Sequence, residues 1–126
     1  MILPTHGLTA AAEHLLTPPP GVTYTTAPGT RARAAAALLR LALDETMDTF
    51  WKDVSPAMTR TSGRTKALCL ERYVSPSVAR QWYAVWSALS AACHHHICEL
   101  PPTPAEVRAW HQDVIELLTV LPATRR

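Results

Sequence analysis

The sequence predicts an all-α protein, an antiparallel bundle of four to five helices preceded by a proline-rich irregular segment. Apolar residues recur at three- and four-residue steps in several stretches, and proline-containing links separate these stretches. The period-two alternation of a strand and the Asn-Gly signal of a hairpin do not occur. Short links favour helices that run in opposite directions. We place the irregular segment in residues 1–30 and a single helical domain in residues 31–126.

The first 30 residues carry the weakest helical signal. Residues 9–16 (TAAAEHLL) could form two helical turns. Three prolines from Pro18 to Pro20 should end them, because proline lacks an amide hydrogen and fixes its own φ. Residues 22–29 have only turn and extended character. We expect this segment to wrap over the helical domain or to stay mobile.

A long amphipathic helix is expected over residues 34–51, which are rich in strong helix formers. Arg40 and Asp44 lie one turn apart on its polar face. Ser55 and Pro56 should end the helix, because a residue before proline disfavours the helical region. The apolar stripe consists of Leu39, Leu43, Met47, Phe50, Trp51 and Val54.

Two further helices should follow. Residues 65–73 predict a short one, with Leu68, Cys69 and Tyr73 as its apolar residues. Ser75 is a good N-cap, and proline is favoured at the next position, so a longer helix should run from there to about residue 97. Its apolar face contains Val78, Trp82, Val85, Trp86, Leu89, Cys93 and His96. Large aromatic residues at this spacing are typical of a core.

The last helix has the clearest start in the sequence. Thr103 can cap it, Pro104 occupies the first position and Glu106 can complete a capping box. A stripe with a period near 3.6 follows, made of Val107, Trp110, His111, Val114, Leu117, Leu118 and Leu121.

The composition restricts the classes of function. Apolar residues make up 48% of the chain and charged residues only 17%, which suits either a tight core or an apolar face for a partner. The net charge of +2 lacks the strong basic field of a dedicated nucleic-acid binder. The three cysteines form no CxxC motif, which favours a reducing cytoplasm, and no apolar run reaches the roughly 20 residues of a membrane span. The four glycines form no phosphate-binding loop, and we expect no cofactor.

The run from His94 to His96 is the main candidate for chemistry. Consecutive helical residues point about 100° apart, so the three imidazoles cannot converge on one ion from a regular helix. A histidine at a helix end could still act as a general acid or base, with Glu99 orienting it. A ribonuclease would also need an arginine to hold the phosphate. The sequence places none just before these histidines, so it would have to come from elsewhere in the fold or from a second subunit.

A metal site is a second possibility for the same region. Cys93, His96 and His111 lie on facing stripes of two helices joined by a proline-containing turn. The simpler interpretation is structural. In that interpretation some of the histidines are buried with hydrogen-bonded nitrogens, and others bind the last carbonyls of a helix.

Four basic residues gather between the second and fourth predicted helices. They could meet RNA phosphates or an acidic partner, or form a solvated face. These residues are Arg60, Arg64, Lys66 and Arg72.

Residues 86–100 (WSALSAACHHHICEL), with the helix that starts after Pro101 and Pro102, resemble segments of bacterial HEPN-superfamily proteins. That resemblance implies a dimeric helical bundle, often part of a toxin–antitoxin or phage-defence system. Active HEPN proteins are metal-independent ribonucleases with an Arg, four to six intervening residues and a His. His94 or His95 would match the histidine, but the arginine position falls on residues 87–90 and holds no Arg.

The leading hypothesis is therefore a cytoplasmic, non-catalytic helical module that binds a protein partner and self-associates, with RNA as another possible partner. It is motivated by the low charge, the strong apolar stripes and the missing catalytic arginine. The alternatives are a metal-independent ribonuclease using His94, His95 or His96 with Glu99, and a metal site built on histidine and cysteine.

Overall fold

The structure is a computed structural model that describes residues 5–94 and 100–124. Within these ranges the chain is all-helical and contains no strand, which confirms the predicted all-α class. The α-helices are α1 (Thr5–Leu16), α2 (Pro28–Val54), α3 (Gly63–Tyr73), α4 (Pro76–Cys93) and α5 (Pro104–Thr124), and a 3₁₀ helix, η1 (Pro56–Arg60), follows α2. None of the helices in the described part of the chain has the length and apolar character needed to cross a bilayer.

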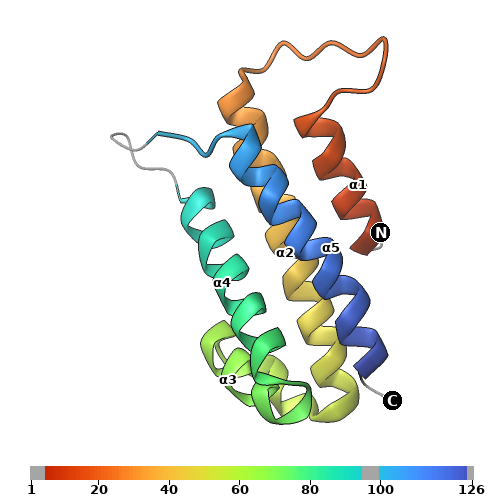
Figure 1. Ribbon diagram of the computed structural model, residues 1–126, viewed down its shortest axis with the longest axis vertical. Helices are drawn as coiled ribbons and strands as arrows, with labels where there is room; N and C mark the ends of the chain where they lie inside the picture. The colour runs from red at the N-terminus through yellow and green to blue at the C-terminus, as the bar shows by residue number, and fades with distance from the viewer. Residues whose placement is uncertain (1–4, 95–99, 125–126) are drawn as a thin grey trace.

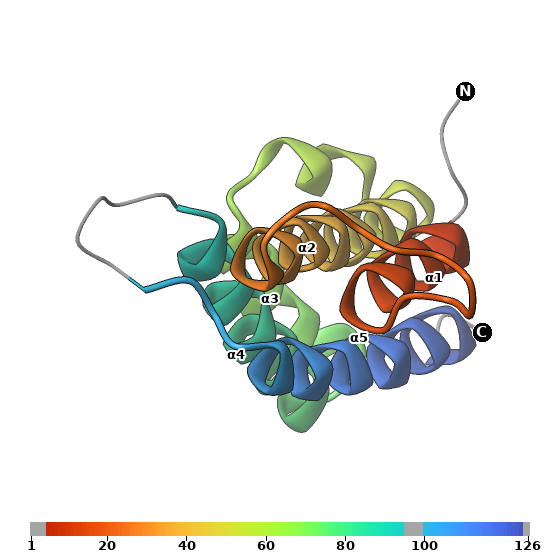
Figure 2. The ribbon, with the colours of Figure 1, turned by 90° about the horizontal axis from the view of Figure 1, so that it is seen from above.

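Helix α2 is the element around which the others are arranged. It contacts α1, α4 and α5, and α4 and α1 each also contact α5. Figure 1 shows that α1, α2, α4 and α5 run alternately up and down, with α3 beside the lower end of α4. Seen from above in Figure 2, α2 lies between α1 and α4, and α5 runs along one side of the group, below α2 in the picture.

The apolar stripe predicted for α2 forms the centre of the core. Leu39, Leu43, Met47 and Trp51 are fully buried, and Phe50 is 3% exposed. Burying an aliphatic or aromatic side chain of this size contributes about 1.5–3 kcal/mol. Trp51 also donates from its indole nitrogen to the sulfur of Met47, at 3.1 Å. The helix starts at Pro28, two turns earlier than the strongest helix formers suggest, and ends before Ser55-Pro56 as predicted.

Helix α1 is longer than the two turns expected from residues 9–16. It starts at Thr5, and its Leu8, Ala12 and Leu16 are buried against α2 and α5. Their spacing of four residues places them on one side of a helix. Local sequence gave a weak signal because the threonines and alanines of α1 have little apolar surface of their own.

Two arginines hold the carboxyl end of α1. Arg108 of α5 donates to the carbonyl of Leu16 at 3.0 Å, and Arg31 of α2 donates to the carbonyl of Leu15 at 3.4 Å. The last carbonyls of a helix have no partners within it and carry partial negative charge, so cationic donors stabilise them. These bonds tie α1 to both of its neighbours.

Both predicted N-caps are confirmed, but α4 is shorter than expected. Ser75 accepts a hydrogen bond from the amide of Val78, and Thr103 and Glu106 form the reciprocal bonds of a capping box. The expectation that α4 runs to about residue 97 is wrong, because the helix ends at Cys93. The amide of His94 closes its last turn by donating to the carbonyl of Ala91, at 3.3 Å.

Other helices cover the polar face predicted for α2 only in part, because the side chains of Arg40, Asp44 and Asp48 remain 37%, 42% and 40% exposed. Trp86 of α4 donates from its indole nitrogen to the carboxylate of Asp44, at 2.9 Å. The guanidinium of Arg40 lies 5.4 Å from the centre of the same indole. Lys66 of α3 pairs with Asp48 at 2.9 Å. The charges on this side of α2 therefore position two other helices.

The start of α3 also packs directly against Trp86. A Cβ atom added to Gly63 would lie 2.8 Å from an atom of the six-membered ring of Trp86. That ring is held by Asp44 and by stacking with Trp82, whose ring lies 5.6 Å away at 14°. The close approach favours glycine, because the hydrogen bond and the stacking both hold the indole in place.

We expect Gly63→Ala to destabilise the protein by about 1–3 kcal/mol, because a methyl group forced into a packed contact strains its neighbours. At an exposed helical position without such a contact, glycine to alanine would instead stabilise the protein, because alanine lowers the conformational entropy of the unfolded chain. Chemical denaturation of a double-mutant cycle with Trp86→Phe checks the cause. In the Trp86→Phe background, the smaller ring should remove most of the destabilisation caused by Gly63→Ala. An equal loss of stability with either ring at this position would contradict the proposed clash.

Burial raises the pKa of Asp44 above its usual 3.8, although the bond from Trp86 and the charge of Arg40 both lower it. The folded state therefore holds this proton more tightly than the unfolded chain does. Its stabilising effect is fully present below pH 3.8 and is lost as the pH rises through the folded pKa.

Asp44→Asn removes this titration and keeps an oxygen that can accept from Trp86. The stability of the natural protein relative to the variant should fall as the pH rises from about 3 to about 7. Urea denaturation of both proteins at several pH values measures the difference. A difference that stays flat or grows with pH would contradict the direction of the shift.

Candidate functional site

Of the predicted catalytic residues, the structure describes only His94. It lies directly after α4 with an extended backbone, at φ −74° and ψ 129°, and it is exposed. His95, His96 and Glu99 lie outside the described residues.

The structure brings an arginine to the cavity that His94 lines. Arg33 of α2 donates from Nε to the carbonyl of Ala92, at 3.3 Å. Arg33 and His94 line the same cavity of about 450 Å³, together with Glu106 and Trp110 of α5. Sequence analysis missed Arg33 because it precedes Ala92 by 59 residues and belongs to another helix.

Cys93 faces α2. It lines a small cavity of about 270 Å³ with Arg40 and Asp44. Burial raises the pKa of the Cys93 thiol, while the charges of Arg40 and Arg33 lower it less. A thiol with a raised pKa is mostly protonated at neutral pH, so it is a poor nucleophile.

His111 faces α1 instead. Its Nε2 donates to the carbonyl of Thr9 at 3.1 Å and lies 4.0 Å from a carboxylate oxygen of Glu13. Cys93 and His111, two of the three candidate metal ligands, therefore have different neighbours, and the third, His96, is not described. No group of three histidine, cysteine or acidic side chains in the described ranges could hold a metal ion. The hydrogen bond of His111 is the structural role that the simpler interpretation predicts.

The four basic candidates do not form one patch. Lys66 is only 14% exposed and is paired with Asp48. Arg60 is exposed on η1, and Arg64 and Arg72 are exposed on α3. Arg64 and Arg72 share a face with Leu68 because the three residues are four apart. Arg80 of α4 joins them at the same surface.

The surface between α3 and α4 contains a groove of about 380 Å³ with an apolar floor. Leu68 of α3 is 58% exposed there, and Tyr83 of α4 is 38% exposed. Small side chains complete the floor, and charged side chains form its rim. The floor residues are Ala67, Leu68, Ala79, Tyr83 and Ala84, and the rim residues are Arg64, Glu71 and Arg80.

The sequence did not predict this groove. It assigned Leu68 and Tyr73 to the apolar side of their helix, but the buried residues of α3 are Ala67 and Leu70. Both large side chains are exposed instead. The sequence did contain one indication that Leu68 is exposed. Arg64 and Arg72 lie four residues before and after it, and arginines at that spacing form a solvent-facing stripe.

Comparisons of the chain with models of protein families, with curated proteins and with solved structures found no match.

Proposed function

We propose that this chain is a non-catalytic helical-bundle module that binds a protein through the α3–α4 groove. The observation that carries the proposal is the exposure of Leu68, at 58%, in a groove that also exposes Tyr83. Tyr83 is held in place by stacking on Trp86, with ring centres 6.0 Å apart. A rigid aromatic side chain beside an aliphatic one in a concave surface is typical of a binding hot spot.

The charges around the groove favour an acidic partner. Arg64, Arg72 and Arg80 lie at or beside its rim, and Glu71 is the acidic residue among them. A second copy docked here would bring two arginine-rich rims together, which costs free energy. Self-association, expected from the sequence, therefore remains a prediction for another face.

The apolar floor favours protein over RNA. Protein–nucleic acid interfaces are more polar and more positively charged than protein–protein interfaces. Leucine, tyrosine and three alanines form this floor, and the arginines lie only at its edge. We infer that the partner is an amphipathic helix whose apolar side meets Leu68 and whose flanking residues are acidic. Membership of a toxin–antitoxin or defence system, which the HEPN resemblance implies, stays part of this proposal.

Photo-cross-linking from the groove tests the proposal directly. A protein with Tyr83→p-benzoylphenylalanine, irradiated in cells of its native host, should cross-link to a protein segment that mass spectrometry identifies as acidic and amphipathic. Adding Leu68→Asp should abolish the cross-link. The new carboxylate repels an acidic segment, and burying its charge in an apolar interface costs free energy. Leu41→Asp, on the 45% exposed Leu41 of α2, is the matched control and should leave it intact.

Other outcomes of this experiment would contradict the proposal. A cross-link to a second copy of this chain would replace the acidic partner with a homodimer. A cross-link to RNA, or one that survives Leu68→Asp, would show that the groove is not a protein-docking site.

Ribonuclease activity is the second candidate, and Arg33 is the observation that favours it. Arg33 lines the same cavity as His94, so it would be the phosphate-binding group that the local sequence lacks.

If this candidate is right, purified protein should cleave RNA in the presence of a chelator. His94→Ala should reduce cleavage by about 100-fold or more, as expected for loss of a general acid or base. Arg33→Lys, which keeps the charge but not the bidentate geometry, should also lower the rate. His14→Ala, on the exposed His14 of α1, is the control. Cleavage that is absent, or equal in all variants, rejects this candidate.

A further inference from the structure

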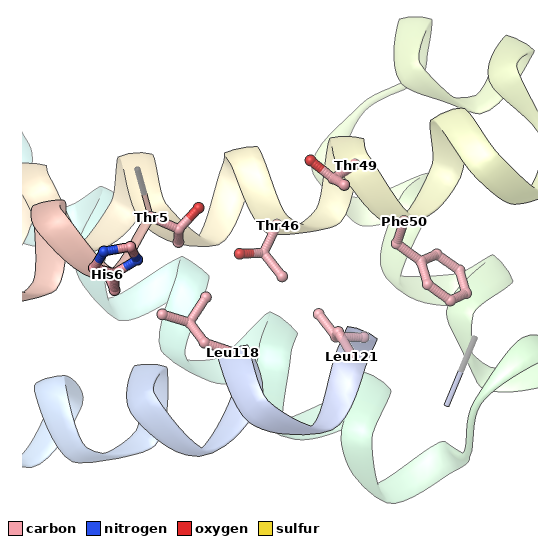
Figure 3. A pocket seen from close by; sticks show the side chains of 7 residues that line it. All are labelled: Thr5, His6, Thr46, Thr49, Phe50, Leu118 and Leu121. Carbon is pink, nitrogen blue, oxygen red and sulfur yellow. The ribbon is translucent and has the colours of Figure 1, made fainter. Parts of the chain in front are cut away.

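Helix α2 has one exposed side between α1 and α4. Figure 2 shows these two helices on either side of α2, with α5 below it. Thr46 and Phe50 lie on the side of α2 that faces α5, where they line a cavity with residues of α1 and α5, as Figure 3 shows. We call the exposed side the outer face of α2. Its residues are exposed or partly exposed and are spaced at steps of three and four: Thr30, Ala34, Ala37, Leu41, Glu45 and Asp48.

The apolar part of the outer face combines a large residue with a small one. Leu41 is 45% exposed, and Ala37, one turn before it, is exposed as well. Both line a hollow of about 270 Å³ that reaches Cys93 at the end of α4. A cavity of roughly 150 Å³ in a protein interior can hold a benzene molecule, so this hollow has room for an aliphatic side chain placed over Ala37. The face therefore has both a protruding side chain and a place that receives one.

The charges of α2 differ between its two halves. The charged residues before Leu41 are Arg31, Arg33 and Arg40, and those after it are Asp44, Glu45, Asp48, Lys52 and Asp53. The half that precedes Leu41 is thus basic, and acidic residues predominate in the half that follows. Two copies that meet through the outer face with their α2 helices antiparallel place the basic half of one beside the acidic half of the other, which favours association. Parallel helices would bring like charges together.

We propose that the protein forms a homodimer through the outer face of α2, with the two α2 helices antiparallel. Leu41 of each copy packs on Ala37 of the other, so the same contact occurs twice about a two-fold axis. Arg33 of one copy then lies at the level of Glu45 of the other, because each is four residues beyond the contacting pair. The outer face shares no residue with the α3–α4 groove, so both surfaces can be used at once.

The strength of self-association tests the role of Leu41. One helix face buries little area, so the dimer should be weak, with a Kd on the order of 10⁻⁵ M. Analytical ultracentrifugation from about 5 to about 500 µM should show the dimer forming. Leu41→Asp should raise the Kd by about 100-fold or more, because it brings a carboxylate into an apolar contact. Circular dichroism should show the same thermal unfolding for this variant, because Leu41 is 45% exposed in the single chain.

Ala37→Phe distinguishes this dimer from general adhesion of apolar surfaces. The phenyl ring occupies the place that Leu41 of the other copy takes, and it also adds exposed apolar area. The proposed dimer should therefore weaken by about tenfold or more, whereas non-specific association would become stronger. Leu68→Asp is the matched control, because it places the same charge in the α3–α4 groove and should leave the dimer unchanged.

The antiparallel arrangement is tested through its charges. Glu45→Lys turns an attraction into a repulsion at two symmetric places, so it should weaken the dimer by about tenfold or more. Glu116→Lys, on the exposed Glu116 of α5, makes the same change in net charge and should have no effect. Raising the ionic strength from about 0.05 M to about 0.5 M should also weaken association of the natural protein, because salt screens exposed charges.

Cys93 reports where the two copies meet, because it lines the hollow that the dimer covers. A short treatment with iodoacetamide, followed by peptide mass spectrometry, should alkylate Cys93 more slowly at a concentration where the dimer forms than at one where it does not. Cys69 of α3, which is also a free and partly exposed thiol, should react at the same rate at both concentrations.

Several results would overturn the proposal. They are a protein that stays monomeric at about 500 µM, fifty times the expected Kd, and a dimer that survives Leu41→Asp, gains strength from Ala37→Phe or is unaffected by Glu45→Lys. Alkylation of Cys93 at one rate at both concentrations would place the dimer interface elsewhere. A dimer broken by Leu68→Asp would assign self-association to the α3–α4 groove and would contradict the function proposed for that groove as well.

Discussion

The hydrogen bond from Trp86 to Asp44 is the interaction on which most of the structure depends. It joins the middle of α4 to the polar side of α2 at 2.9 Å and fixes the direction of a large, partly buried indole. One edge of that indole packs on Gly63, where α3 begins, and another ring, that of Tyr83, stacks on it beside the groove. A carboxylate that burial keeps from full solvation gains from such a donor, and this contact joins the packing of α3 on α4 in positioning α3 and the groove.

The arginines show how a chain with few charges uses them. Arg31 and Arg108 bind the last carbonyls of α1, and Arg33 binds a carbonyl near the end of α4. Each satisfies a backbone acceptor that the helix leaves without a partner, and each links two helices at the same time. The exposed arginines Arg64 and Arg80 are instead at the rim of the groove, where they can set the charge of a partner.

Some features of the fold could be predicted because their causes are local. The capping box of Thr103 and Glu106 depends on residues three apart, and it is confirmed in full. The end of α2 before Pro56 follows from the geometry of one peptide unit. The end of α4 at Cys93 could not be predicted in this way, since the residues after it are compatible with a helix. Nor could the cavity that Arg33 and His94 both line, because the two residues belong to segments far apart in the chain.

The sequence by itself determined the all-helical class, the apolar stripes of α2 and α5 and the residues that begin α4 and α5. These properties follow from helical periodicity and from bonds within one turn, which neighbouring residues decide. Only the tertiary structure decided that Leu68 remains exposed, that Asp44 accepts from Trp86 and that Thr46 lines a cavity. Each of these depends on which helix covers which face. The packing of the helices is the arrangement with the lowest free energy for all contacts together, so it cannot be predicted from any single stretch of the sequence.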